Sequence, residues 1–385
     1  MFEVESAGQA ITVLRNAKVC DGSAADGVHA DVWIQGERVL AIQPPGVAPM
    51  GLDTDAAARC VVHDCTGLVI APGFIDVHTH DDAVVLDHPD MIAKLSQGIT
   101  TVVTGNCGIS LIPMVISDPK APLSLWGTKQ FRFDSLPAYR EAIDQTQPGV
   151  NMAVLIGHTT LRMQVMTDLD KPASPVEIAE MCRILDHAMR EGALGMSSGV
   201  FYRQAYAASQ DELTALVKVV AGYGGVYSTH IRDELRGIVE AIEEAALTAR
   251  QAGAPLVLSH HKCAGPANWG RTTETLPLIE KLALQQPISM DVYPYTMTGM
   301  SASRFGLTGW GRLKPGFFAD IVVINPDKIR DQATYADPVQ FSDGVEQVWV
   351  NGRLSFLGRE KRAVARAGAF VSRNGLEGPQ TRDTI

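Results

Sequence analysis

The feature that most constrains this chain is an apolar run, residues 73–80, that ends in two histidines. It reads Gly-Phe-Ile-Asp-Val-His-Thr-His, with the histidines at His78 and His80. Side chains alternate between the faces of a β-strand, so His78 and His80 should project from the same side. Two imidazoles at the carboxyl end of a buried strand suit a divalent metal if other strands add ligands. A bare His-x-His is more often a pair of surface histidines, so other residues must decide.

Length and composition favour a barrel with a small accessory domain. The chain has 385 residues, of which 46% are hydrophobic, enough for a large core. The net charge of -10 argues against a nucleic-acid surface, and no apolar run approaches the ~18 residues of a membrane span. The acidic N-terminus does not read as a signal peptide. Six scattered cysteines suit a reducing compartment, so we expect a cytoplasmic protein without nucleic-acid or membrane partners.

The two ends of the chain carry similar patterns of short strands. Residues 10–70 alternate between strand-like runs and turns, and the pattern returns at 319–324 and 345–352. Strands at both ends of an α/β region predict one β-domain assembled from both ends. Residues 357–385 are rich in Arg, Gly and Ala without an apolar period, which predicts a weakly ordered tail.

The middle of the chain alternates helix and strand, which is typical of a parallel sheet. A helix over 91–97 should end at Gly98, before a β-branched strand over 99–104. Capping boxes at Ser174 and Ser209 predict two further helices, and another should run from about 235 to 250, before a strand over 256–258. Seven candidate barrel strands end at His80, Cys107, His158, Ser198, His230, His260 and Tyr295.

Four of these strand ends carry candidate metal ligands, at the edge where a (β/α)8 barrel builds its active site. A lone cysteine such as Cys107 is usually a small buried hydrophobe, and a lone strand-end histidine is usually structural. Their convergence with the first two histidines makes coincidence improbable. One thiolate with two imidazoles is a set that zinc accepts well. His260 and His261 face opposite ways, so spacing within the strand leaves open which of them is the ligand.

Several of these segments resemble a known family. The run from Pro72 to His80 resembles the first barrel strand of the amidohydrolase superfamily. The segments at 105–108, 228–232, 259–262 and 291–295 are similar, more narrowly, to the N-acyl-D-amino-acid deacylases, or D-aminoacylases. The resemblance covers about residues 10–355 with one break.

The resemblance implies a fold and a set of site residues. It implies an α/β fold with a (β/α)8-type amidohydrolase barrel over residues 71–311, plus a small β-sandwich domain built from 1–70 and 312–356. It favours His260 over His261 and implies a Zn²⁺ cofactor. The implied ligands of the tightly bound zinc are Cys107, His230 and His260, those of a weaker second site are His78 and His80, and the residues that bind the substrate carboxylate are Lys262 and Tyr202.

In such relatives zinc polarises the amide carbonyl, and an aspartate at the end of the eighth strand moves the proton from water to the leaving amine. Here the chain passes from Tyr295 directly to 297–306, which in relatives is the helix before the returning β-domain. We therefore expect the eighth strand and its aspartate to be absent. Asp343 is no substitute because it leads into a β-domain strand, and Asp76 and Asp291 do not match the catalytic position.

The sequence thus predicts a zinc-dependent hydrolase that cleaves small-molecule N-acyl-D-amino acids, impaired by the loss of the catalytic aspartate. One alternative is a hydantoinase- or dihydroorotase-like cyclic-amide hydrolase. Those relatives commonly bridge two metals with a lysine from the fourth strand, and residues 193–198 contain none. The other alternative is a non-catalytic zinc-binding remnant, which only the missing aspartate favours.

Overall fold

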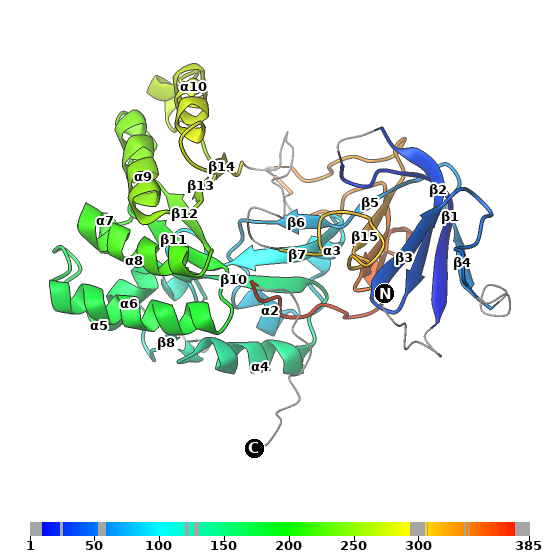
Figure 1. The fold of residues 1–385 in the computed structure, drawn as a ribbon, viewed down its shortest axis with the longest axis horizontal. Helices are drawn as coiled ribbons and strands as arrows, with labels where there is room; N and C mark the ends of the chain where they lie inside the picture. Colours follow the sequence, from blue (N-terminus) through cyan, green and yellow to red (C-terminus); the bar gives the residue numbers. More distant parts are fainter. Residues whose placement is uncertain are drawn as a thin grey trace.

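The computed structural model describes residues 10–23, 26–52, 59–119, 123–126, 131–292, 305, 307–334, 336–337 and 339–373. Two large sheets organise these residues, a curled seven-stranded sheet and a nine-stranded sheet at the other end of the molecule (Figure 1). A hairpin-like pair, β8 (Met114–Val115) and β9 (Arg132–Phe133), forms a third, small sheet. No helix in the described part of the chain has the length and apolar character needed to cross a membrane.

The seven-stranded sheet is parallel throughout and runs in the order β14-β13-β12-β11-β10-β7-β6. Its strands are β6 (Phe74–Asp76), β7 (Ile99–Thr104), β10 (Asn151–Gly157), β11 (Gly195–Gly199), β12 (Val226–His230), β13 (Leu256–Leu258) and β14 (Ile288–Met290). Parallel strands buried on both faces read as near-continuous apolar runs, and every residue of β10 is buried. Within the described residues β6 and β14 are the edges of this sheet. Whether an eighth strand is lost stays a prediction.

Several strands end before the predicted residue: β7 ends at Thr104, before Cys107, and β13 ends at Leu258, before His260. β6 ends at Asp76, so His78 and His80 lie in the loop that follows it rather than on the strand. β10 ends at Gly157, and His158 begins the next helix, with its Nε2 2.8 Å from the buried carboxylate of Glu212. The predicted end at Tyr295 and the predicted helix over 297–306, apart from Phe305, lie outside the described residues.

Helices cover the outer side of the parallel sheet (Figure 1). The longer ones are α4 (Leu136–Thr146), α5 (His158–Val165), α6 (Pro175–Arg190), α8 (Gln210–Gly222), α9 (Ile238–Ala252) and α10 (Thr272–Ala283). Short helices are α2 (Val84–Asp87), α3 (Ile92–Leu95), α7 (Arg203–Tyr206) and the 3-10 turns η1 (Leu123–Trp126), η2 (Pro266–Asn268) and η4 (Gly358–Glu360). The helix predicted over 91–97 is therefore a single turn, and the one predicted from about 235 begins at Ile238.

The two predicted capping boxes differ in the structure. At the start of α6 the box is complete, because Ser174 and Glu177 each bond the other's backbone N–H. At the start of α8 Ser209 accepts the N–H of Glu212, but the Glu212 carboxylate turns into the core. There it accepts two hydrogen bonds from Arg162 and one from His158. A carboxylate in the core must have such partners, whereas the helix can begin without the second bond of the capping box.

The nine-stranded sheet joins strands from both ends of the chain in the order β18-β17-β16-β15-β5-β1-β2-β3, with β4 beside β1. Its strands are β1 (Ile11–Val19), β2 (Val28–Gln35), β3 (Arg38–Gln43), β4 (Val61–Asp64), β5 (Val69–Pro72), β15 (Ile321–Ile324), β16 (Val345–Val350), β17 (Arg353–Leu357) and β18 (Arg362–Ala363). The antiparallel pair β5–β15 connects the two halves. The pairing is one continuous sheet, and its division into the two layers of a sandwich stays a prediction.

The segment 357–373 is ordered, contrary to the predicted weakly ordered tail. It contains η4 and β18, and then Phe370 and Val371 are buried. Backbone hydrogen bonds join Met152 of β10 to Ala369 and Val371. The two apolar side chains, spaced too closely to show a period, are enough to dock the segment on the parallel sheet. Residues 374–385 lie outside the described part.

A buried polar joint connects the two large sheets. Asp320, just before β15, accepts hydrogen bonds from Asn151 Nδ2 and from the backbone N–H of Asn351, each at 2.7 Å. Asn151 begins β10, so this joint lies at the amino-terminal end of the parallel strands. Burial raises the pKa of Asp320 to about 7, although these hydrogen bonds act to lower it.

Candidate metal centre

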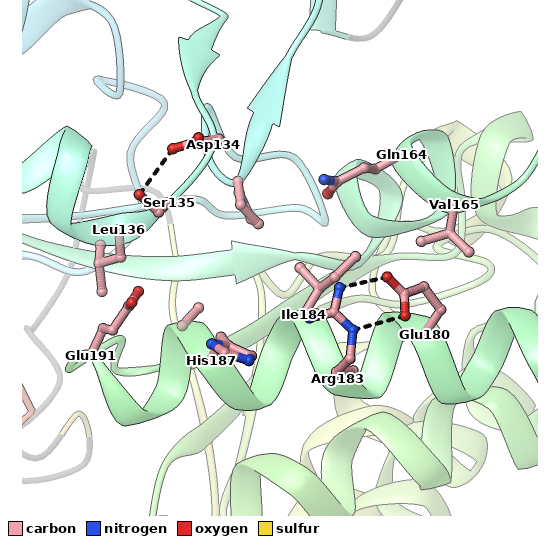
Figure 2. A pocket seen from close by; sticks show the side chains of 12 residues that line it. Asp134, Ser135, Leu136, Gln164, Val165, Glu180, Arg183, Ile184, His187 and Glu191 are labelled. Carbon is pink, nitrogen blue, oxygen red and sulfur yellow. Dashed lines mark hydrogen bonds and ion pairs between the residues drawn. The ribbon is translucent and has the colours of Figure 1, made fainter.

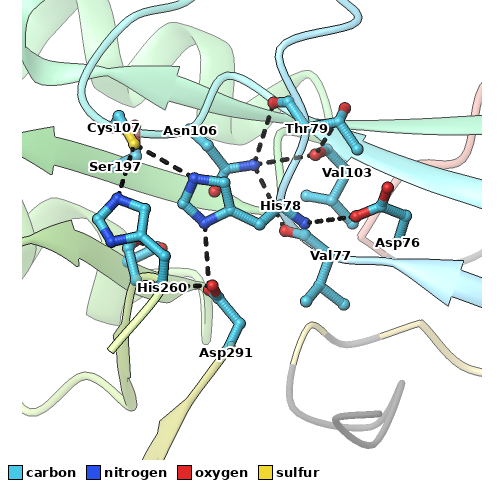
Figure 3. Close-up of polar contacts among 12 residues, drawn as sticks. Asp76, Val77, His78, Thr79, Val103, Asn106, Cys107, Ser197, His260 and Asp291 are labelled. Atoms are coloured by element: carbon cyan, nitrogen blue, oxygen red, sulfur yellow. Dashed lines mark hydrogen bonds and ion pairs between the residues drawn. The ribbon is translucent and has the colours of Figure 1, made fainter. Parts of the chain in front are cut away.

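The five predicted metal ligands converge beyond the carboxyl ends of the parallel strands. One donor atom each from Cys107, His230 and His260 lie within 4.8 Å of one another, and so do those from His78, His80 and Cys107. Cys107 belongs to both groups. Its Sγ is 3.2 Å from His78 Nε2 and 3.4 Å from His260 Nε2 (Figure 3).

The backbone around these ligands is unusual. Cys107 and His260 have φ angles of 53° and 37°, in the left-handed region that non-glycine residues seldom occupy. A Cβ on Gly105 would lie 1.9 Å from the carbonyl oxygen of Leu155, and one on Gly108 would lie 2.5 Å from the backbone nitrogen of Gly199. Only glycine therefore lets the Cys107 loop pack against β10 and β11. Such local strain is concentrated at functional sites.

The electrostatics of the cluster suit a cation. Burial raises the pKa of the Cys107 thiol, but the surrounding histidines outweigh burial and hold the pKa well below its ordinary value. His230 is only 6% exposed, and neither of its ring nitrogens makes a hydrogen bond in the described structure, although Nε2 lies 3.5 Å from Glu234 Oε1. Buried polar atoms are rarely left unpaired. A thiolate beside imidazoles, one of them without a hydrogen bond, fits zinc, which prefers sulfur and nitrogen ligands.

The neighbouring predicted residues take different positions. His261 faces away, with its Nε2 2.9 Å from the hydroxyl oxygen of Thr275 on α10. Lys262 reaches the cluster, and its Nζ lies 3.1 Å from His260 Nδ1. Tyr202 precedes α7, and its ring centroid is 5.0 Å from that of His230. The structure thus brings both predicted carboxylate-binding residues beside the predicted metal ligands.

Two buried carboxylates complete the surroundings of the histidines, and neither was assigned a role from the sequence. Asp291 follows β14, and its Oδ2 lies 3.2 Å from His78 Nδ1 while its Oδ1 accepts the backbone N–H of His260 at 2.5 Å (Figure 3). Glu234 follows β12, and its Oε1 lies 3.1 Å from His260 Nδ1 and 2.6 Å from Lys262 Nζ. Each carboxylate contacts the ring nitrogen opposite the one that faces Cys107.

Asp291 and Glu234 differ in how far the sequence alone indicates their position. Asp291 lies in one of the segments that carried the family resemblance, so its position near the site was foreseeable although its contact with His78 was not. Glu234 lies in a loop four residues after His230, and nothing in the spacing marks it. Burial raises the pKa of Glu234, but contacts with His230, His260 and Lys262 outweigh burial and hold the pKa far below its usual range.

A cleft of about 500 Å³ lies elsewhere, beside α6 (Figure 2). Leu136 of α4, Val165 of α5 and Ile184 of α6 contribute to its walls, and Arg183 within it pairs with Glu180 at 2.6 Å. None of the predicted site residues lines this cleft.

Comparison with known proteins identifies the family. The sequence pattern described as "Amidohydrolase family" matches residues 61–297, more than half of the chain. The chain belongs to the amidohydrolase family. This amidohydrolase is 33% identical to the D-aminoacylase of Alcaligenes xylosoxydans xylosoxydans, with 93% of the chain and 98% of the relative covered. It is 32% identical to the N-acyl-D-aspartate deacylase of the same organism, with 96% of each covered.

Solved structures agree with the sequence relatives. A crystal structure of D-aminoacylase matches this amidohydrolase with a TM-score of 0.87 at 31% identity, covering 93% of the chain and 99% of the other. The N-acyl-D-glutamate deacylase of Bordetella bronchiseptica, complexed with zinc and a phosphonate inhibitor, matches with a TM-score of 0.84 at 28% identity, covering 94% and 99%. The predicted family, and with it the class of metal-dependent amide hydrolases, is confirmed.

Proposed function

We propose that this amidohydrolase is a zinc-dependent hydrolase that cleaves N-acyl-D-amino acids to a carboxylate and a D-amino acid. The observation that carries the proposal is the Cys107 thiol, whose neighbours are histidines at or just after the ends of three other strands. Its support from relatives is the resemblance to D-aminoacylase over nearly the whole of both chains.

The residues that would hold zinc are those whose donor atoms converge. Cys107, His230 and His260 would hold the tightly bound ion, and His78 and His80 would share Cys107 in a weaker second site. The buried His230 supports this assignment, because neither of its ring nitrogens makes a hydrogen bond in the described structure. Zinc bound here supplies a Lewis acid that polarises an amide carbonyl and lowers the pKa of water.

The substrate's carboxylate would be bound beside the ligands by Lys262 and Tyr202. The Lys262 side chain is 32% exposed, so its ammonium can reach a substrate in solution while it contacts the cluster. A phenol hydroxyl can donate a second hydrogen bond to the same carboxylate. Two fixed contacts with the carboxylate, together with the reacting amide, orient the stereocentre and so provide a physical basis for preferring one enantiomer.

Proton transfer is the step at which this chain should differ from its relatives. The alignment with D-aminoacylase spans 482 positions, more than the 385 residues of this chain, so the relative contains residues without a counterpart here. That supports the internal loss of a segment. Asp291 and Glu234 contact the Nδ1 atoms of His78 and His260, on the far side of each ring from Cys107, so we assign neither as the general base. Without a general base the rate should be about 10²–10⁴-fold lower.

The test is hydrolysis of N-acetyl-D-methionine and N-acetyl-D-glutamate, with the L-enantiomers as controls, by the chain loaded with one equivalent of zinc. We expect slow, D-selective release of the amino acid. Hydantoin and dihydroorotate provide a further arm, because ring opening of either would favour a cyclic-amide hydrolase, although β11 has no lysine to bridge two metals. If the chain binds zinc but hydrolyses none of these compounds, it is a non-catalytic zinc-binding remnant and the proposed activity is wrong.

A further inference from the structure

One carboxylate contacts both the metal ligands and the lysine that would bind substrate. Glu234 is only 6% exposed. Its Oε1 lies 2.6 Å from Lys262 Nζ, 3.1 Å from His260 Nδ1 and 3.5 Å from His230 Nε2. A single oxygen atom is therefore shared by a metal ligand and by the ammonium of Lys262.

We propose that Glu234 is a positioning residue that couples zinc binding at His260 to carboxylate binding at Lys262. The inference rests on the proposed function, because it takes His260 as a zinc ligand and Lys262 as the group that binds the substrate carboxylate. It adds that carboxylate binding at Lys262 should tighten zinc binding at His260, which neither assignment states.

The first step concerns the tautomer of His260. Its Nε2 faces Cys107 at 3.4 Å, so this nitrogen must keep its lone pair to bind a metal, and the ring proton must then be on Nδ1. Lys262 Nζ lies 3.1 Å from Nδ1 but has only protons to donate, whereas Glu234 Oε1, also at 3.1 Å, can accept. Glu234 therefore selects the zinc-binding tautomer and, through its charge, makes Nε2 a stronger donor.

The second step concerns competition for the shared oxygen. The Lys262 ammonium offsets part of the negative charge of Glu234 and so weakens its pull on the proton of His260 Nδ1. When a substrate carboxylate engages Lys262, part of that compensation is withdrawn and Glu234 acts more strongly on His260. Zinc should then be held more tightly, and by reciprocity bound zinc should strengthen binding of the carboxylate.

Burial makes the coupling large enough to measure. At about 6% exposure for Glu234 and His260, little water screens the charges, so a change at Lys262 is felt at His260 instead of being absorbed by solvent. If Glu234 only stabilised the fold, Lys262→Met would change zinc affinity by the same factor whether or not Glu234 is present. A double-mutant cycle of Glu234 and Lys262 therefore distinguishes coupling between the two sites from a purely structural role of Glu234.

The experiment measures the zinc dissociation constant by competition with a chromophoric chelator, for the full chain and for Glu234→Gln, Lys262→Met and the double variant. We expect Glu234→Gln to weaken zinc binding about 10- to 100-fold. Lys262→Met should tighten zinc binding about 5-fold, and the double variant should match Glu234→Gln. Glu274→Gln, which removes an exposed carboxylate paired with Arg271, is the matched control and should change nothing.

A second arm adds D-methionine, the amino-acid product, which should tighten zinc binding by the full chain but not by Glu234→Gln or Lys262→Met. The coupling is wrong if Lys262→Met leaves zinc affinity unchanged, or shifts it equally with and without Glu234. If Glu234→Gln fails to fold by circular dichroism, Glu234→Asp and Lys262→Met carry the test, since the shorter carboxylate should give an intermediate affinity. Zinc affinity needs no turnover, so absent hydrolysis with an intact cycle would overturn the proposed activity alone.

Discussion

Two buried carboxylates at opposite ends of the parallel sheet behave in opposite ways. Glu234 at the candidate metal cluster is 6% exposed and Asp320 at the joint between the sheets is 3% exposed, so burial disfavours the charged form of both. Glu234 contacts an ammonium and two imidazoles, and its pKa is lowered. Asp320 contacts the Asn151 amide and the Asn351 backbone N–H, and its pKa is raised to about 7.

The difference shows that burial alone does not decide the charge of a carboxylate; the charge of its partners does. The Lys262 ammonium at 2.6 Å and the two imidazoles at 3.1 and 3.5 Å more than offset the cost of desolvating Glu234, whereas neutral amide donors leave desolvation dominant at Asp320. The carboxyl edge of the sheet thus holds a charged cluster suited to chemistry. The amino-terminal edge, where conserved polar groups in barrels usually serve stability, holds a joint that is best neutral.

The largest effect is expected at Cys107, on which the charged cluster at the carboxyl edge depends. Cys107→Ser replaces the thiolate with a hydroxyl that stays protonated and binds zinc poorly, so zinc affinity should fall by more than the ~100-fold typical of an outer partner. Deacylation should disappear as well. Zinc titration and hydrolysis of N-acetyl-D-methionine measure the two effects. Cys182→Ser, on α6, is the matched control, and unchanged zinc binding by Cys107→Ser would refute the cluster.

The joint can be tested through its pH dependence. Because the pKa of Asp320 is raised from 3.8 to about 7, the folded state keeps a proton that the unfolded state loses above about pH 4. Stability from this group is fully present below pH 4 and falls as pH rises to 7, by about 4 kcal/mol at most. Asp320→Asn cannot titrate, so its unfolding free energy relative to wild type should rise across that window. Urea denaturation from pH 4 to 7 measures the difference, and a flat difference would contradict a raised pKa.

The second carboxylate at the cluster allows a sharper comparison. Asp291→Asn removes the charge behind His78, so a second equivalent of zinc should bind about 10-fold more weakly. The first equivalent should be unaffected, since an amide oxygen can still accept the backbone N–H of His260. Isothermal titration calorimetry with two equivalents separates the steps. Asp343→Asn, an ion-paired carboxylate beside β16, is the control. Loss of the first site alone would mean that Asp291 serves His260 rather than His78.

The smallest effect is expected far from both carboxylates. Ser174→Ala removes the cap of α6, including the bond to the N–H of Glu177, and should lower the free energy of unfolding by about 1 kcal/mol. Ser209→Ala, which removes the corresponding bond at α8, is the comparison. Urea denaturation measures the loss, and zinc affinity should stay unchanged in both variants. A change in zinc affinity would mean that these helices are coupled to the cluster.

Patterns within a few residues accounted for much of the molecule. The strands over 99–104 and 256–258 appear with the predicted bounds, and the complete capping box at Ser174 begins α6 as expected. Alternation of apolar runs with helical segments predicted a parallel sheet, and the described residues form one of seven strands. Such features depend on local backbone preferences and on periodicity, both of which are visible in the sequence.

Features that depend on distant partners were predicted less well. Glu212 has the spacing of a capping residue, but His158 and Arg162 draw its carboxylate into the core. Phe370 and Val371 show no periodicity, yet they dock on β10. The loop positions of His78 and His80 also escaped prediction, because strand bounds depend on pairing with a neighbour as much as on composition.

By itself, the sequence determined the family and the residue types that can bind zinc, because ligand chemistry belongs to the side chain and the motifs are local. Only the tertiary structure decided which atoms face one another. It turned His261 toward Thr275 and His260 toward Cys107, and it placed Glu234 and Asp291 behind the histidines. Those contacts join residues from different loops and from α10, and their geometry follows from how the sheet curls and where each chain segment leaves it.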